Sequence, residues 1–142
     1  MHEAPTHDPP RIHVTERDWR RLTSMLTVPG ARWSTARCDA LDAELALAVV
    51  VPSASVRPDV VTMNSRVRFE VIGKRTYDRT LVYPWDADEE TGRISVLSPL
   101  GSALLGLSVG DTMTWALPDG TAVDVRVLEV LFQPEAAGDH WL

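Results

Sequence analysis

Apolar residues recur at helical spacing near the start of the chain. Trp19, Leu22 and Leu26 are three or four residues apart, and they place one apolar stripe on a helix that runs to about Leu26. The segment Thr15–Asp18 resembles a capping box, with Asp in place of the usual Glu or Gln at its fourth position. The pattern therefore predicts a first helix that begins at Thr15.

A second apolar stripe follows a break in the chain. Pro29 and Gly30 end the first helix, and Ser34 or Thr35 is suited to cap the next one. The second stripe consists of Cys38, Leu41, Leu45 and Val49. Because the connection is short, we expect residues 13–51 to form an antiparallel helical hairpin, a short coiled coil whose apolar stripes face each other. Each arm of about 12 to 16 residues would be roughly 18 to 24 Å long.

The rest of the chain alternates polar and apolar residues as β-strands do. Strand patterns lie near residues 60–62, 66–71, 79–83, 93–97, 112–117 and 122–132. The turn Pro118-Asp119-Gly120 favours a hairpin between the last two strands. Ser98 and Pro99 suit the start of one short helix, and Gly106 suits its end. The pattern predicts an antiparallel sheet with one short helix.

These elements predict an α+β fold in several parts. Residues 1–12 are rich in proline and polar residues, which is typical of a mobile tail, and residues 52–59 have the composition of a linker. The sheet and its helix would then occupy residues 60–142. We expect few contacts across the linker, so that residues 58–142 fold without the hairpin.

Charge and hydropathy exclude some classes of function. The net charge of −6 argues against a protein whose main task is to grip phosphate backbones, so we expect no sequence-specific nucleic-acid binding. The longest apolar run, Leu45–Val51, is too short for a bilayer, which needs about 20 such residues. The first residues also lack the basic and apolar parts of a signal peptide. These features predict a cytoplasmic protein without a membrane partner.

The residue pattern predicts neither a metal site nor a cofactor. The four histidines lie near the two ends of the chain and lack zinc-site spacing. The acidic run at 86–90 lacks the ligand series of a calcium loop and is typical of a solvated turn. Cys38 fits a small core residue, and Ser98 has no base beside it in any nucleophile motif. We expect no catalytic residues.

One segment carries a family resemblance. Residues 98–111, with a Ser-Pro, a short Ala-Leu-rich helix and a Gly-Asp turn, resemble the C-terminal domain of the Gre transcript-cleavage factors. Residues 59–67, 80–84 and 133–139 are similar to the Gre-related family of regulators of nucleoside diphosphate kinase, called Rnk, and the likeness extends from about Thr15 onward. The resemblance implies that the sheet and short helix form an FKBP-like domain.

The Gre resemblance also implies a site at the hairpin tip, where Gre factors present carboxylates that help to hold a catalytic metal. The corresponding segment here, residues 27–34, contains no Asp or Glu, and hard cations need oxygen ligands. Asp39, Asp42 and Glu44 lie further along the second helix, where we expect them to form its solvated face. The resemblance therefore points to a protein that does not stimulate RNA cleavage.

Partner-binding residues also follow from the resemblance. In Gre factors the residues around the Ser-Pro contact a coiled coil at the rim of the polymerase secondary channel, which makes Ser98 and Pro99 the candidates here. Leu97 stands where Gre factors tend to carry Asn or Asp, and Ser98 is equally explained as a helix cap. At the tip, formed by Pro29, Gly30, Arg32 and Trp33, the Arg-Trp pair either contacts a protein partner or packs back on the helices.

The sequence thus predicts a non-catalytic regulator that binds RNA polymerase at the secondary-channel rim and competes with Gre-type factors. Nucleoside diphosphate kinase would be affected only indirectly. We expect a monomer, because the two helical stripes already cover each other. The alternatives are a reduced cleavage stimulator, an FKBP-like prolyl isomerase, which needs an aromatic-lined cleft, and an adaptor unrelated to polymerase.

Overall fold

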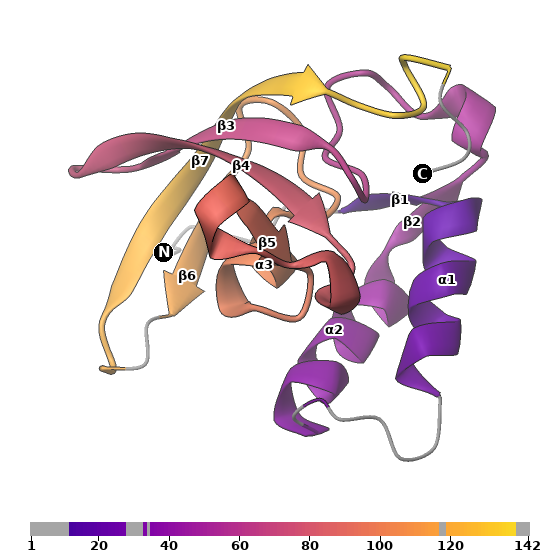
Figure 1. The fold of residues 1–142 in the computed structure, drawn as a ribbon, viewed down its shortest axis with the longest axis horizontal. Coiled ribbons are helices and arrows are strands. Elements are labelled where there is room, and N and C mark those ends of the chain that lie inside the picture. Colours follow the sequence, from indigo (N-terminus) through magenta and orange to yellow (C-terminus); the bar gives the residue numbers. More distant parts are fainter. Residues whose placement is uncertain (1–11, 28–32, 34, 117–118, 139–142) are drawn as a thin grey trace, which may run out of the picture.

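The structure, a computed structural model, describes residues 12–27, 33, 35–116 and 119–138. Two helices stand beside a twisted five-stranded sheet, and a third, short helix lies against that sheet (Figure 1). The predicted α+β architecture, a helical pair followed by a sheet with one short helix, is confirmed.

The first two helices are α1 (Glu16–Leu26) and α2 (Thr35–Leu47). Thr15 caps α1 as predicted, since its Oγ1 accepts a hydrogen bond from the Asp18 amide at 3.1 Å. The prediction that the second helix includes Val49 is wrong. Val49–Val51 form strand β2, which pairs in parallel with β1 (His13–Thr15), because three consecutive β-branched residues favour extended backbone.

The large sheet has the strand order β5-β4-β3-β7-β6. Its strands are β3 (Arg66–Val71), β4 (Arg75–Val82), β5 (Arg93–Ser95), β6 (Thr112–Ala116) and β7 (Ala122–Phe132). The predicted ranges 66–71 and 122–132 are confirmed, and the antiparallel pairing of β6 with β7 confirms the predicted hairpin, although Pro118 of its turn lies outside the described residues. The expected strand at 60–62 is wrong, since Val60 forms a single bridge to Ser108.

The sheet is mixed rather than fully antiparallel, which corrects the prediction at one strand. β5 pairs in parallel with β4, with Thr80 opposite Arg93. Parallel neighbours need a connection that carries the chain back along the sheet. Two short 3-10 helices, Pro84–Asp86 and Glu89–Thr91, provide that return.

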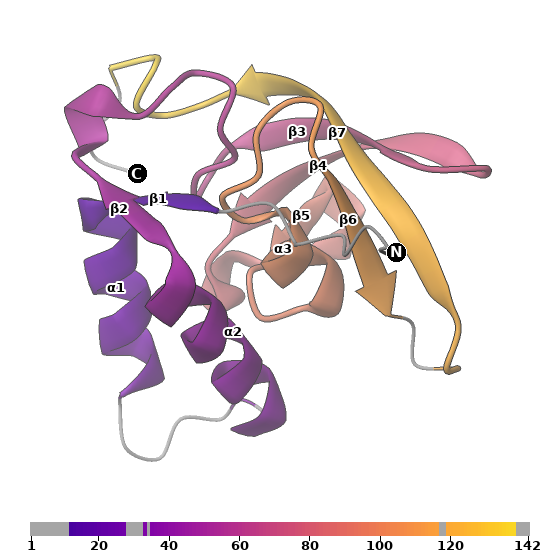
Figure 2. The same cartoon turned by 180° about the vertical axis from the view of Figure 1, so that it is seen from behind.

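The hydrophobic core is continuous between the helices and the sheet. Leu22 and Met25 of α1 and Leu41 and Leu45 of α2 belong to the same buried cluster as the inner residues of β3 and β7. Figure 2 shows β1 and β2 at the end of the helical pair where α1 begins and α2 ends. The expectation of few contacts between the two parts is therefore wrong, and the independent folding of residues 58–142 remains a prediction.

Polar side chains reinforce this junction. The Asp18 carboxylate, which the capping-box pattern assigned to its own helix, instead accepts the Met63 amide at 3.0 Å. The Gln133 side-chain amide donates to the carbonyls of Val60 at 2.9 Å and Arg57 at 2.7 Å. These long-range bonds hold the segment after the helices in place.

Candidate functional site

The predicted partner-binding residues form a corner between β5 and the short helix α3 (Pro99–Leu104). Ser98 caps α3: its Oγ accepts the Gly101 amide at 3.0 Å and donates to the Ser95 carbonyl at 2.7 Å. The Ser95 hydroxyl in turn accepts the Leu97 amide at 3.0 Å. The Ser98 hydroxyl therefore both accepts and donates a hydrogen bond, and it links the first turn of α3 to the end of β5.

The side chains at this corner differ in exposure. Leu97 is buried in the core, whereas Pro99 is exposed at the first position of the helix. Gly101 lies so close to β5 that a Cβ there would overlap the Ser95 carbonyl group. The close approach of helix to strand holds Pro99 at a defined place on the surface, a role of Gly101 that sequence reasoning missed.

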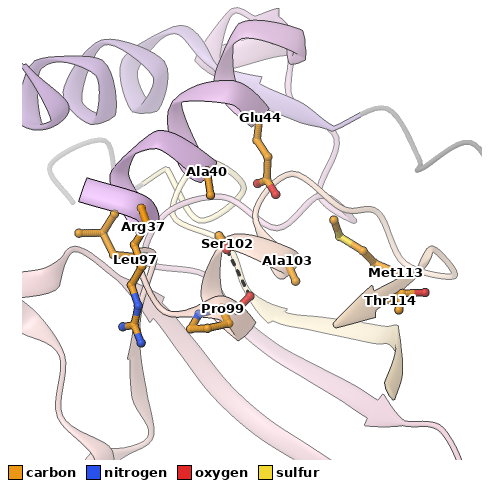
Figure 3. Close-up of a pocket in the computed structure, with 10 residues that line it drawn as sticks. Arg37, Ala40, Glu44, Leu97, Pro99, Ser102, Ala103, Met113 and Thr114 are labelled. Atoms are coloured by element: carbon orange, nitrogen blue, oxygen red, sulfur yellow. Dashed lines mark hydrogen bonds between the residues drawn. The ribbon is translucent and has the colours of Figure 1, made fainter. Parts of the chain in front are cut away.

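A groove of about 290 Å³ opens beside Pro99, between α2 on one side and α3 with β6 on the other (Figure 3). Its lining residues are mostly small or apolar: Ala36, Arg37, Ala40, Glu44, Leu97, Pro99, Ser102, Ala103, Met113 and Thr114. Residues 37, 40 and 44 lie on one face of α2 because of their helical spacing. The groove thus joins the helical pair to the predicted docking corner.

Glu44 is the unusual member of this lining. Figure 3 shows its carboxyl group pointing from α2 into the groove, toward Ser102 and Ala103 of α3. Its Oε2 is buried and has no hydrogen-bond partner among the described residues, and burial raises the pKa of the carboxyl to about 7. The prediction that Glu44 belongs to a solvated face is wrong, whereas Asp39 and Asp42 are exposed as predicted.

The structure describes only one residue of the predicted tip site. Trp33 is partly buried and packs against the core, and its ring lies 6.4 Å from that of Trp85, centroid to centroid. This arrangement favours packing over a free contact surface for Trp33. Pro29, Gly30 and Arg32 lie outside the described residues.

A second cleft, of about 350 Å³, lies on the inner face of the sheet next to α3. The rings of Phe69 and Tyr77 stack in it with their centroids 5.6 Å apart, and Lys74 and Arg79 also line it. The Arg79 guanidinium carbon lies 5.2 Å from the Tyr77 ring centroid, within the range of a cation–π contact. The aromatic-lined cleft that an isomerase requires therefore exists in this fold.

The described part of the chain contains no group of three His, Cys, Asp or Glu side chains that could hold a metal ion. The acidic turn is a local structure there: Asp88 Oδ1 accepts the Glu90 amide at 3.1 Å. Within the same ranges, no helix is both long and apolar enough to span a bilayer.

Sequence reasoning missed three functional or structural side chains: Asp18, Glu44 and Gln133. Glu44 left a signal, because it follows Leu41 by three residues and precedes Leu45, which places it beside the buried stripe of α2. Asp18 likewise lies four residues before Leu22 and seven before Met25, on the buried side of α1. Gln133 gave no such signal, since its partners are more than 70 residues away along the chain.

Comparison with known proteins agrees with this fold. Residues 56–132 match the family model for the C-terminal part of the transcription elongation factors GreA/GreB, and residues 10–51 match the model for the Rnk N-terminus. The chain is 43% identical over 134 residues to the regulator of nucleoside diphosphate kinase of Escherichia coli (strain K12), a match that covers 94% of this chain and 98% of the relative.

Two further relatives are named as transcription factors. Transcription elongation factor GreA of Thermodesulfovibrio yellowstonii is 31% identical over 98 residues, which cover 68% of this chain and 61% of the relative. A solved structure described as a prokaryotic transcription elongation factor GreA/GreB from Nitrosomonas europaea has a TM-score of 0.69 and 44% identity, and the match covers 87% of this chain and 99% of that one. The chain therefore belongs to the Rnk family of regulators of nucleoside diphosphate kinase, and its second part is a GreA/GreB C-terminal domain.

Proposed function

We propose that the protein is a non-enzymatic transcription regulator that binds RNA polymerase through the β5–α3 corner and the groove beside it. The observation that carries this proposal is the corner: Pro99 is exposed on a backbone held by the hydroxyls of Ser95 and Ser98. A surface that is rigid before binding loses little conformational entropy when a partner docks. Relatives named as transcription elongation factors share this part of the chain.

The proposed binding place is the rim of the secondary channel, where the protein would compete with Gre-type factors. Residues 27–34 provide no carboxylate for a metal ion, and Asp39 and Asp42 are exposed along α2 rather than at the tip. The arms are also short, since the 11 residues of α1 extend only about 16 Å. The protein would therefore occupy the channel entrance without supporting cleavage.

This proposal places the protein in the cytoplasm as a monomer. The buried apolar residues of α1 and α2, namely Leu22, Met25, Leu41 and Leu45, are covered within the chain, whereas Leu47 is exposed. An effect on nucleoside diphosphate kinase would arise indirectly, through altered transcription.

A cleavage assay tests the absence of catalysis and the competition together. The protein is added to backtracked elongation complexes with labelled RNA and Mg²⁺, alone or with a Gre factor. We expect no shortened transcripts from the protein alone, and slower cleavage by the Gre factor as the protein concentration rises. Shortened transcripts at a Gre-like rate would overturn the non-enzymatic proposal, and unchanged Gre activity at saturating protein would overturn the shared binding place.

A pair of variants tests the docking corner. Pro99→Asp adds a charge to the exposed surface and leaves the Ser98 cap in place, whereas Ser98→Ala removes the cap, at a cost of about 1 kcal/mol of stability, and leaves Pro99. We expect Pro99→Asp to weaken binding to core RNA polymerase at least tenfold, and Ser98→Ala to weaken it less. Unchanged affinity of a folded Pro99→Asp protein would remove the corner from the proposal.

Prolyl isomerase activity is a second candidate, favoured by the cleft that Phe69 and Tyr77 line. A protease-coupled assay with a proline-containing chromogenic peptide tests it. Acceleration above the uncatalysed rate that Tyr77→Ala abolishes would support this candidate. A rate equal to the uncatalysed one would exclude isomerisation of that peptide.

A further inference from the structure

The carboxyl group of Glu44, on a half-buried side chain, has no structural role among the described residues. Its Oε2 atom is covered by protein, yet the described residues offer it no hydrogen-bond donor. Buried polar groups are nearly always hydrogen-bonded, because leaving one unsatisfied costs free energy. A side chain of this kind on the wall of an open groove therefore points to a ligand.

Among the residues that the structure describes, the surroundings of Glu44 provide no partner. Arg37 is the one charged residue besides Glu44 among the described residues of the groove lining, and it lies two helical turns away, about 10 Å along the axis. Its side chain points away from Glu44 in Figure 3. Burial is the cause of the raised pKa of Glu44, with no contribution from a charged neighbour in the described chain. The facing elements α3 and β6 contribute only uncharged side chains to this lining.

The shape and charge of the groove indicate what would enter it. Ala36, Ala40 and Ala103 leave space along its walls, and Met113 adds apolar surface. An arginine packs its methylene stem on apolar surface while its planar head donates several hydrogen bonds, and its weaker hydration makes it better suited than lysine to a buried ion pair. A negatively charged protein with a net charge of −6 also attracts a basic segment.

We propose that Glu44 is the acceptor for an arginine side chain that the docked polymerase segment inserts into the groove beside Pro99. This inference rests on the proposed function and assigns a contact residue on α2, outside the GreA/GreB-type domain. Glu44 and Pro99 then bind the same segment from opposite walls of the groove.

The proposal has a consequence for the pH dependence of binding. Pairing with a cation requires the ionised carboxylate, whereas in the free protein the pKa of Glu44 is about 7. Binding therefore releases a proton at lower pH, and the affinity rises with pH until the free carboxyl is ionised. Between pH 6.0 and 7.5 the dissociation constant should fall by about five- to tenfold.

The experiment measures binding of the full chain to purified core RNA polymerase at pH 6.0 and 7.5, for the wild type, Glu44→Gln and the matched control Asp42→Asn. Asp42 is an exposed carboxylate on the same helix, so its variant has the same change in net charge. We expect Glu44→Gln to weaken binding about tenfold at pH 7.5 and to remove the pH dependence. Asp42→Asn should match the wild type at both pH values.

The outcomes separate this inference from the proposed function. A wild type that does not bind the polymerase overturns both. A wild type that binds, with Glu44→Gln equal to it at pH 7.5, overturns the role of Glu44 and leaves the docking proposal in place. Circular dichroism shows whether the Glu44→Gln variant is folded. If the variant does not fold, the pH dependence of wild-type binding is the test. A wild-type affinity that does not change between pH 6.0 and 7.5 contradicts the proposal.

Discussion

Replacing Asp18 by Asn tests how the helices are attached to the sheet. The Asp18 side chain is 2% exposed and accepts the Met63 amide at 3.0 Å. Burial raises its pKa from 3.8 to about 7; the Met63 bond opposes the rise, the charge of Glu135 adds to it, and Arg21 lowers it. Asn keeps an oxygen for the Met63 amide but cannot ionise.

The size of the effect follows from the two pKa values of Asp18. Between pH 3.8 and about 7 the folded protein keeps a proton that the unfolded chain has lost, so the free energy of unfolding falls as the pH rises. The slope is about 1.4 kcal/mol per pH unit and levels off above the folded-state pKa. Between pH 5 and pH 8 the wild type should lose about 2 to 3 kcal/mol through Asp18, and the Asn variant should not.

Urea unfolding of the two proteins at pH 5, 6.5 and 8 provides the assay. The free energy of unfolding of Asp18→Asn, relative to the wild type, should increase by about 2 to 3 kcal/mol from pH 5 to pH 8. Asp42→Asn, at an exposed position of α2, is the control and should keep a constant difference from the wild type. A difference between Asp18→Asn and the wild type that stays constant with pH would show that burial does not raise the pKa of Asp18.

Three further changes probe the fold. Gly101→Ala places a Cβ against the Ser95 carbonyl. We expect thermal unfolding to show a loss of stability of about 3 kcal/mol or more. A loss below about 1 kcal/mol would show that α3 can shift away from β5. Gln133→Leu removes the donor to the carbonyls of Arg57 and Val60, and the free energy of unfolding in urea should fall by about 2 kcal/mol or more. An unchanged urea midpoint would contradict the importance of these bonds. The fragment 58–142 lacks the buried leucines of α1 and α2, so it should melt at a lower temperature than the full chain; an equal melting temperature would show that the sheet does not need the helices.

Most elements could be predicted because local patterns determine them. The Thr15 cap, the alternation in β3 and β7, and the Ser98 cap of α3 depend on neighbouring residues. The parallel pairing of β5 could not be predicted, because it depends on the path of the connection after β4 rather than on the strand itself. Val49 was misassigned because its spacing fits a helix, while its pairing with His13 becomes visible only in the structure.

The candidate site could be predicted only in part, for a similar reason. Ser98 and Pro99 lie in one recognisable motif, so the corner was found from the sequence. The groove needs α2 and α3 to meet, and their residues are some 60 positions apart in the chain, as with Ala40 and Ala103. Glu44 was therefore assigned to a solvated face, since the sequence does not show which helix side faces α3.

The parallel pair β1–β2 has a consequence for the docking proposal. It joins the chain just before α1 to the chain just after α2, and the His13 amide also donates to the Gly106 carbonyl beyond α3 at 3.0 Å. Turning the helical pair and its β1–β2 ladder against the sheet would break the bond from His13 to Gly106. The bond from His13 to Gly106 therefore ties the start of α1 to the chain after α3, and under the docking proposal a partner that contacts both the helices and Pro99 must present its two surfaces at one fixed separation.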